Sequence, residues 1–209
     1  ASSTSTDSCA NIFLGCRAGC SADGSYNIFM GHLAASSGVG YTGSNNIFLG
    51  REVASCAVGN DGSNNIAMGY RAAYGITSGD DNLLLGTYSG YCLTSGLRNI
   101  NLGYSAGCRA ETGNDNVKIG NLAGRCSEGN ENVFIGYNAG TAHTTGDANV
   151  VIGDGGGGVA GSRNVYINNN NTVNLNGDNN FFLGTNAGLC NTDGDHNNYI
   201  GRDAGKCNT

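Results

Sequence analysis

The chain of 209 residues lacks proline and tryptophan, and only 12% of its residues are charged. Ten Lys and Arg residues against sixteen Asp and Glu residues give a formal charge of −6, which leaves no basic face. We therefore expect no nucleic-acid partner. No apolar run approaches the roughly 20 residues of a membrane helix, so we expect no membrane insertion. Glycine is abundant, at 37 residues, but it lacks the three-residue period of collagen.

Groups that could catalyse a reaction are also scarce. The three histidines, His32, His143 and His196, stand at unrelated places in the pattern described below. Neither a Ser-His-Asp arrangement nor a Glu-rich pocket can be assembled around them. We predict that the protein is not an enzyme and has no catalytic residue and no cofactor.

The chain is instead built from an internal repeat. An asparagine, here called the anchor, recurs every 15–19 residues through twelve copies. Glycine stands four residues after each anchor, with Asn168 the exception, and three residues before each later anchor. The anchors are Asn11, Asn27, Asn46, Asn65, Asn82, Asn99, Asn116, Asn132, Asn149, Asn164, Asn180 and Asn197.

Each copy carries a strand signal directly after its anchor. In ten of the twelve copies the residues one and three past the anchor are aliphatic, as in Ile47 and Leu49, whereas the residue between them varies. This alternation predicts a strand, and we expect its constant aliphatic side to face inward. Seven residues past the anchor stands a small residue, as in Ala106-Gly107, which predicts a second wall close to the first.

These features predict an all-β fold, because a copy of about 17 residues cannot hold two helices and its glycines would break a helix. The prediction is a parallel β-solenoid (a β-roll or β-helix) of about twelve coils, each formed by strand, turn, short strand and turn. Residues 1–10 would be an N-terminal lead and residues 11–209 a single solenoid domain. Coils about 4.8 Å apart would stack the anchors as an amide ladder.

The motif Asn–aliphatic–x–aliphatic–Gly–x–x–Ala–Gly, as in NVFIGYNAG (132–140) and NFFLGTNAG (180–188), resembles a known family. It is similar to the head repeats of trimeric autotransporter adhesins, and to repeats of phage and viral tail-fibre-like proteins. The resemblance extends over all twelve copies. It implies a β-roll or fibre, often trimeric, that binds surfaces or matrix.

Aromatic side chains are frequent at the variable central position of the strand. With the aliphatic residues inward, they would form an outer stripe along the rod, and such an apolar stripe would mark a lateral interface. The alternative is that a loop of the same coil covers them. The candidates are Phe13, Phe29, Phe48, Phe134, Tyr166, Phe182 and Tyr199.

Nine cysteines favour an oxidising, extracellular setting. Most of them stand five or six residues past the glycine that follows each anchor by four residues. At this place neighbouring coils would bring two thiols within disulfide range. Cys190 and Cys207 are the clearest expected pair, and one adjacent pair could form among Cys92, Cys108 and Cys126.

Because nine is an odd number, at least one thiol would stay free or bond to another molecule. Cys9 and Cys16, near the N-terminal end, are the candidates for this role. Cys20 stands in the same column as the paired cysteines, and its spacing from Cys16 is a poor zinc signal.

Two further site types have sequence candidates. Gly-Asp-rich segments before the strands are similar to calcium-binding repeats, and the candidate Ca²⁺ ligands in them are Asp80, Asp81, Asp115 and Glu131. The residue directly before the anchor is an arginine in one of the copies between them, and this favours a ladder of oppositely charged side chains over a cation site. Asn170 begins the one glycosylation sequon, in a chain so rich in asparagine that chance could produce it.

Taken together, the sequence favours an extracellular structural protein. No cap is recognisable after the last copy, so coil twelve of one chain could stack on coil one of the next and build a filament, reinforced by a disulfide. The alternative is the head or shaft of an adhesin or tail fibre that binds a cell-surface receptor or glycan, as a trimer joined through the aromatic stripe. Ice binding is disfavoured because the strands carry no Thr-x-Thr ladder.

Overall fold

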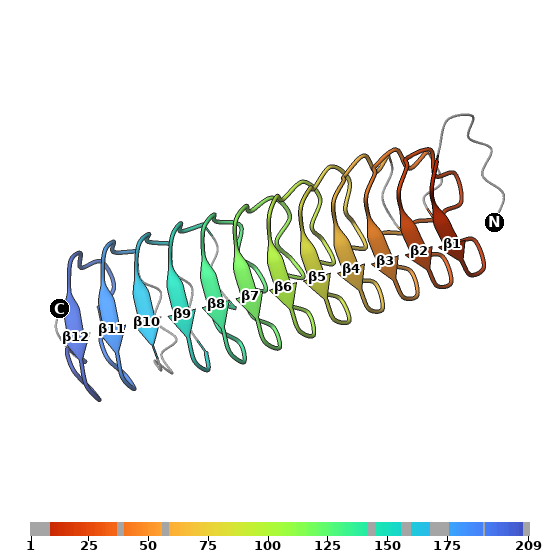
Figure 1. Ribbon diagram of the computed structural model, residues 1–209. Helices are drawn as coiled ribbons and strands as arrows, with labels where there is room; N and C mark the ends of the chain where they lie inside the picture. Colours follow the sequence, from red (N-terminus) through yellow and green to blue (C-terminus); the bar gives the residue numbers. More distant parts are fainter. Residues whose placement is uncertain are drawn as a thin grey trace.

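The computed structural model describes residues 9–36, 40–55, 59–141, 145–155, 160–167, 176–189 and 191–206. Its coils stack into an elongated rod, with one three-residue strand in each coil (Figure 1). The strands are β1 (Ile12–Leu14), β2 (Ile28–Met30), β3 (Ile47–Leu49), β4 (Ile66–Met68), β5 (Leu83–Leu85), β6 (Ile100–Leu102), β7 (Val117–Ile119), β8 (Val133–Ile135), β9 (Val150–Ile152), β10 (Val165–Ile167), β11 (Phe181–Leu183) and β12 (Asn198–Ile200).

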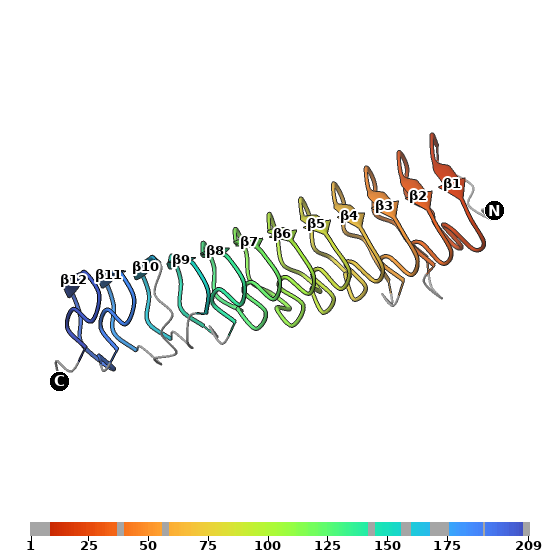
Figure 2. The same cartoon turned by 90° about the horizontal axis from the view of Figure 1, so that it is seen from below.

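The twelve strands form one parallel sheet in chain order, which confirms the predicted parallel β-solenoid. The register is the same at every step, so that each central residue pairs with the central residue of the next strand, as Phe29 does with Phe48. Figure 2 shows the strands along one side of the rod and the connecting segments along the other. Each position of the repeat is therefore also one column along the rod.

The second wall differs from the prediction. Within the described residues it contains turns in place of a second strand, apart from an isolated bridge between Ala22 and Tyr41. The cause is the backbone, because the residues six and eight past the anchor have positive φ, as in Arg71 (53°) and Ala73 (50°). The wall still bonds from coil to coil, for example from Ala73 N–H to the Ser89 carbonyl at 2.9 Å.

The glycine four residues past the anchor is required by two independent features. In Gly103 its φ is +138°, a conformation that L side chains rarely adopt. A Cβ added there would lie 2.4 Å from the carbonyl oxygen of Gly120 in the next coil. The coils thus stack backbone against backbone at this corner.

The anchor asparagines form a continuous hydrogen-bonded column from Asn11 to Asn197. At each of the eleven steps the backbone N–H of one anchor donates to Oδ1 of the anchor before it. In the middle of the rod, Asn116 Nδ2 also donates to Asn99 Oδ1 at 3.1 Å and to the Gly129 carbonyl at 2.9 Å. These buried amides therefore carry out the coil-to-coil bonding that backbone groups alone leave unmade.

Candidate functional site

The central residue of each strand faces the interior, so the expected orientation of the strands is wrong. Phe29, Phe48, Phe134 and Phe182 are 0% exposed and Tyr166 is 6% exposed. Phe13 and Tyr199, at the two ends of the column, are partly buried against the core. The predicted lateral interface of aromatic side chains is therefore corrected: this column is the core of the rod.

The physical reason is the width of the coil. The facing wall consists mostly of small residues, such as Ala34 and Ala35, which are both fully buried. Where the central residue is aromatic, its flat ring fills the space between the walls, and the uniform register stacks neighbouring rings on each other. The ring centroids of Phe13 and Phe29 lie 5.1 Å apart, and those of Phe29 and Phe48 lie 5.2 Å apart.

The first and third residues of each strand consequently face outward, and we call them together the outer aliphatic face. They are apolar in every strand except at Asn198. Halfway along the rod they are partly exposed, as in Met68 at 41%, whereas at the ends Leu14 reaches 61% and Ile200 reaches 68%. This face is the largest feature that the sequence interpretation assigned to the wrong side.

The outer aliphatic face has the size of an interaction surface. Twelve strands about 4.8 Å apart, each presenting a width of roughly 10 Å, give an area on the order of 500 Å². The face contains no charged residue. An apolar patch of about 300–600 Å² is the largest that a monomeric protein usually exposes, and patches of this kind mark contacts with partners.

A second surface feature is a cluster of tyrosine and arginine side chains beside strands β3–β6, here called the tyrosine–arginine cluster. The rings of Tyr74 and Tyr91 are stacked with centroids 4.9 Å apart, and Tyr88 packs edge-on against Tyr91 at 5.6 Å. The Arg71 guanidinium lies 5.1 Å from the ring centroid of Tyr70 and 5.2 Å from that of Tyr74. The full cluster is Arg51, Glu52, Tyr70, Arg71, Tyr74, Tyr88, Tyr91 and Tyr104.

Glu52 holds the arginines of this cluster in place. Its carboxylate accepts hydrogen bonds from Arg71 Nε at 2.6 Å and from Arg51 Nε at 3.0 Å. The bond from Arg71 keeps the pKa of Glu52 below its usual range. Sequence reasoning missed the cluster, although tyrosines that fall five, six or nine residues past consecutive anchors were a readable signal.

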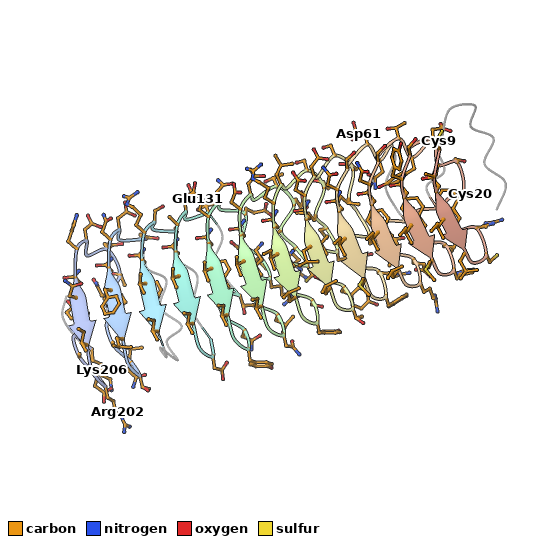
Figure 3. The ribbon with its side chains drawn as sticks, in the orientation of Figure 1. Cys9, Cys20, Asp61, Glu131, Arg202 and Lys206 are labelled. Atoms are coloured by element: carbon orange, nitrogen blue, oxygen red, sulfur yellow. The ribbon has the colours of Figure 1, made fainter. Side chains whose placement is uncertain are left out.

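The candidate calcium ligands lie on an acidic rim where the chain enters the strands, as Glu131 illustrates in Figure 3. Arg98 donates two hydrogen bonds to the Asp115 carboxylate, from Nε at 2.6 Å and from Nη2 at 2.8 Å. This pairing lowers the pKa of Asp115. Asp80 accepts the backbone N–H of Ser63 at 2.7 Å. The described part of the chain contains no group of three or more His, Cys, Asp or Glu residues placed to hold a metal ion.

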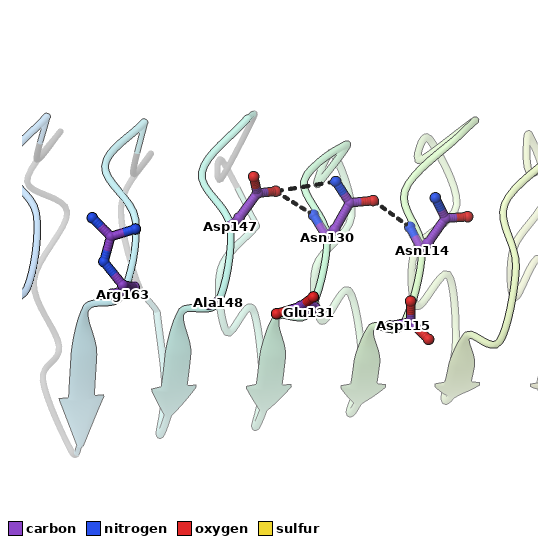
Figure 4. Close-up of a pocket in the computed structure, with 7 residues that line it drawn as sticks. All are labelled: Asn114, Asp115, Asn130, Glu131, Asp147, Ala148 and Arg163. Carbon is purple, nitrogen blue, oxygen red and sulfur yellow. Dashed lines mark hydrogen bonds between the residues drawn. The ribbon is translucent and has the colours of Figure 1, made fainter.

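Glu131 borders a hollow of about 480 Å³ on this rim (Figure 4). Its lining is mixed in charge, since it includes Arg163 as well as Asp115, Glu131 and Asp147, and the Arg163 guanidinium bonds to Asp178 and Asn179 of the next coil. Asp147 Oδ1 accepts the backbone N–H of Asn130 at 2.6 Å, and Asn130 Oδ1 accepts the backbone N–H of Asn114 at 3.0 Å. The polar groups of the hollow are thus largely used to join one coil to the next.

These bonds belong to a second ladder that sequence reasoning missed. It is formed by the residue two places before each anchor, whose side-chain oxygen accepts the N–H of its counterpart in the preceding coil. Its accepting side chains are Ser25, Ser44, Ser63, Asp80, Asn114, Asn130, Asp147, Ser162, Asp178 and Asp195. The recurrence of Ser, Asp and Asn at this position was the signal available.

The described cysteines form no disulfide: Cys16, Cys20, Cys92, Cys108 and Cys126 carry free thiols. The expected pairing among the last three is therefore not found. Cys108 stands nine residues past its anchor, whereas Cys92 and Cys126 stand ten past theirs, so neighbouring coils do not stack thiol on thiol.

Several predicted sites fall outside the described residues. These are Cys190, Cys207, His143 and the glycosylation candidate Asn170. Cys9 lies at the start of the described chain, where its backbone N–H donates to Ser25 Oγ at 3.2 Å.

In the residues that the structure describes, no helix has the length and apolar character needed to cross a membrane. No protein-family model, curated protein or solved structure matches the chain. The two surfaces that could bind a partner are the outer aliphatic face and the tyrosine–arginine cluster.

Proposed function

We propose that the chain is a structural protein that works by association with copies of itself, side by side through the outer aliphatic face. The observation that carries this proposal is the apolar surface that runs along one side of the rod and is interrupted only by Asn198 in β12. Two such faces would bury about 1,000 Å² in total, which reaches the lower end of specific protein interfaces.

The repetitive shape of the face favours a second copy as its partner. Its side chains stand in rows about 4.8 Å apart, and a surface with rows of the same spacing can interdigitate with it, as sheets do in a steric zipper. Another copy of this chain has the same spacing, because it has the same strands. The trimer predicted through the aromatic column is replaced by association through this face, which can also join three rods around one axis.

The test is the mass of the chain in solution, measured by sedimentation equilibrium together with electron microscopy. Leu85→Glu combined with Leu102→Glu places two charges in the middle of the face. We expect the unaltered chain to form a discrete oligomer and this variant to be monomeric, with an unchanged circular dichroism spectrum. A monomeric unaltered chain at about 100 μM, or an oligomer that the variant preserves, would refute the proposal.

Ser78→Glu combined with Ser95→Glu is the matched control. Both serines are exposed and lie outside the strands that form the face. This control adds the same charge and should leave the oligomer intact. A loss of association in the control would indicate that net charge, and not the face, governs the result.

Association end to end, the filament predicted from the sequence, is a further mode of the same proposal. It is supported by the identical register at every step from β1 to β12, which a junction between two chains could repeat. Long filaments in the micrographs, with a repeat near one rod length, would support this mode. An extracellular setting also stays a prediction, supported by the nine cysteines in the sequence.

The second candidate function is that of an adhesin or tail-fibre module, and the tyrosine–arginine cluster favours it. Clustered Tyr and Arg side chains are typical of the residues that dominate binding interfaces. Tyr104, at 51% exposed, is the most accessible ring of the cluster. Tyr104→Ala and Tyr88→Ala should reduce binding to a panel of surface glycans, whereas Tyr137→Ala, at a similarly exposed ring outside the cluster, should not. Binding that survives both cluster variants would exclude this site.

A further inference from the structure

The column of central strand residues contains one polar pair among its apolar side chains. Asn101 of β6 and Lys118 of β7 are paired in register, and both occupy the central, inward-facing position of their strand. Asn101 is 0% exposed and Lys118 is 1% exposed. Their neighbours in the same column are Leu84 on one side and Phe134 on the other.

Both side chains are poorly satisfied for groups buried so deeply. Neither Nδ2 nor Oδ1 of Asn101 has a hydrogen-bond partner in the described structure. Lys118 Nζ donates to the Ser127 carbonyl at 3.2 Å. A buried amide with no partner costs roughly 1–3 kcal/mol, so its presence calls for a physical explanation.

The facing wall confines the two side chains to one slot. A Cβ added at Gly107 would lie 2.7 Å from Asn101 Nδ2, and a Cβ added at Gly124 would lie 2.7 Å from Lys118 Cδ. Glycine at these two places lets the side chains lie against the backbone. Because paired parallel strands are about 4.8 Å apart, rotation of the four-carbon lysine chain can bring its nitrogen to the carboxamide carbon of Asn101.

The environment also supplies the reactive form of the amine. Burial lowers the pKa of Lys118 to about 8, and the carboxylate of Glu128 only partly offsets this effect. About one tenth of the amine is then neutral at pH 7, compared with well under one thousandth for an exposed lysine. A neutral lysine amine in an apolar pocket is a competent nucleophile.

We propose that Lys118 and Asn101 join through an intramolecular isopeptide bond. The lone pair of neutral Nζ attacks Cγ of Asn101, a bond from Nζ to Cγ forms, and the bond from Cγ to Nδ2 breaks. One proton passes from Nζ to the departing Nδ2, which leaves as ammonia. The reaction needs no oxidant and no cofactor, and the Ser127 hydroxyl, buried without a hydrogen-bond partner in the described structure, is a group that can carry the proton.

The product would tie coil six to coil seven covalently at the middle of the rod. It would replace a buried amine and an unpaired carboxamide by one secondary amide. This inference rests on the interior of a single chain, so it stands or falls independently of the proposed association between chains.

The test is the intact mass of the folded chain after incubation at pH 8, followed by tryptic peptide mapping. We expect a mass below that of the sequence by one ammonia molecule, about 17 Da. Trypsin should not cleave at Lys118, and residues 99–109 should be recovered in a branched product with residues 110–125. A mass that equals the full sequence would overturn the proposal.

Variants at Asn101 provide the controls. Asn101→Leu cannot react and should show no mass loss, whereas Asn101→Asp can lose only water, about 18 Da. The Asn176–Gly177 dipeptide can also lose ammonia by closing a succinimide ring. A deficit that persists in Asn101→Leu, or that maps to Asn176 with Lys118 still cleaved, would overturn the proposal as well.

Discussion

The interior of coils one to three and the interior of coils six and seven are filled in opposite ways. The first contains the stacked rings of Phe13, Phe29 and Phe48, with Tyr41 packed edge-on against two of them. The second contains Asn101 and Lys118, and it separates the two hydrophobic clusters of the rod.

The backbone frame is nevertheless the same in both regions. The step from Asn46 N–H to Asn27 Oδ1 measures 2.9 Å, and the step from Asn116 N–H to Asn99 Oδ1 measures 3.1 Å. The strands also pair in the same register in both places. The frame is therefore fixed by hydrogen bonds of the backbone and of the anchor asparagines. The central strand position can carry an aromatic or a polar side chain without a change in this frame.

The largest effect should come from removing an aromatic ring. Phe29→Ala should lower the free energy of unfolding by about 3–5 kcal/mol, because the cavity lies between two rings that cannot collapse onto each other. Ile66→Ala, on the outer aliphatic face at 37% exposure, is the matched control and should cost about 1 kcal/mol. Urea titration measures both values. Equal losses would mean that the inward and outward positions contribute alike.

Removing one anchor asparagine should have an intermediate effect on stability, and the effect should be equal in the aromatic and the polar region of the rod. Asn46→Ala and Asn116→Ala each leave a buried backbone N–H of the next coil without its acceptor, which costs about 1–3 kcal/mol. If the frame is independent of the filling, their unfolding free energies should fall by the same amount. A clearly larger loss at Asn46 would show that the aromatic stack and the ladder stabilise each other.

The smallest effect concerns pH and applies to the polar region alone. In Asn101→Leu, Lys118 keeps its amine, with a pKa of about 8 in the folded chain against 10.5 for an ordinary lysine. Between these values the unfolded chain binds more protons, so stability should rise with pH, by about 1 kcal/mol between pH 7 and pH 9. The loss of stability caused by burying the protonated amine is complete below pH 8 and disappears above about pH 10.5.

Lys118→Met in the same Asn101→Leu background removes this dependence and is its control. The unaltered chain, if its amine is consumed in the isopeptide bond, should also lack the rise. Urea titrations at the two pH values decide the matter. A rise of the same size in the Lys118→Met variant would assign it to other groups.

The repeat made the frame predictable, because a glycine or asparagine at a fixed place has a single structural cause in every copy. Asn99 illustrates this, since the spacing of the anchors alone predicted a ladder. The orientation of the strand was not predictable in the same way. In Ile47–Leu49 all three side chains are apolar, and a three-residue strand has too few alternations to separate its two sides.

Polar residues at the central position misled the interpretation further. Asn101 and Lys118 argue for an outward position by the general rule that charges avoid the interior, yet both are buried. The wall of small residues was the better guide, because it leaves the space opposite each strand to be filled by the central side chain of that strand. The tyrosine–arginine cluster depends on contacts between different coils, which no single copy displays.

The copies differ in length by up to four residues, from 15 to 19, yet every strand meets the next in one register. All variation in length is therefore absorbed outside the sheet, and each copy advances the rod by the same step of about 4.8 Å. The length of the rod is therefore set by the number of copies. Gain or loss of one copy in a gene would lengthen or shorten the rod by one coil spacing and leave every other contact in place.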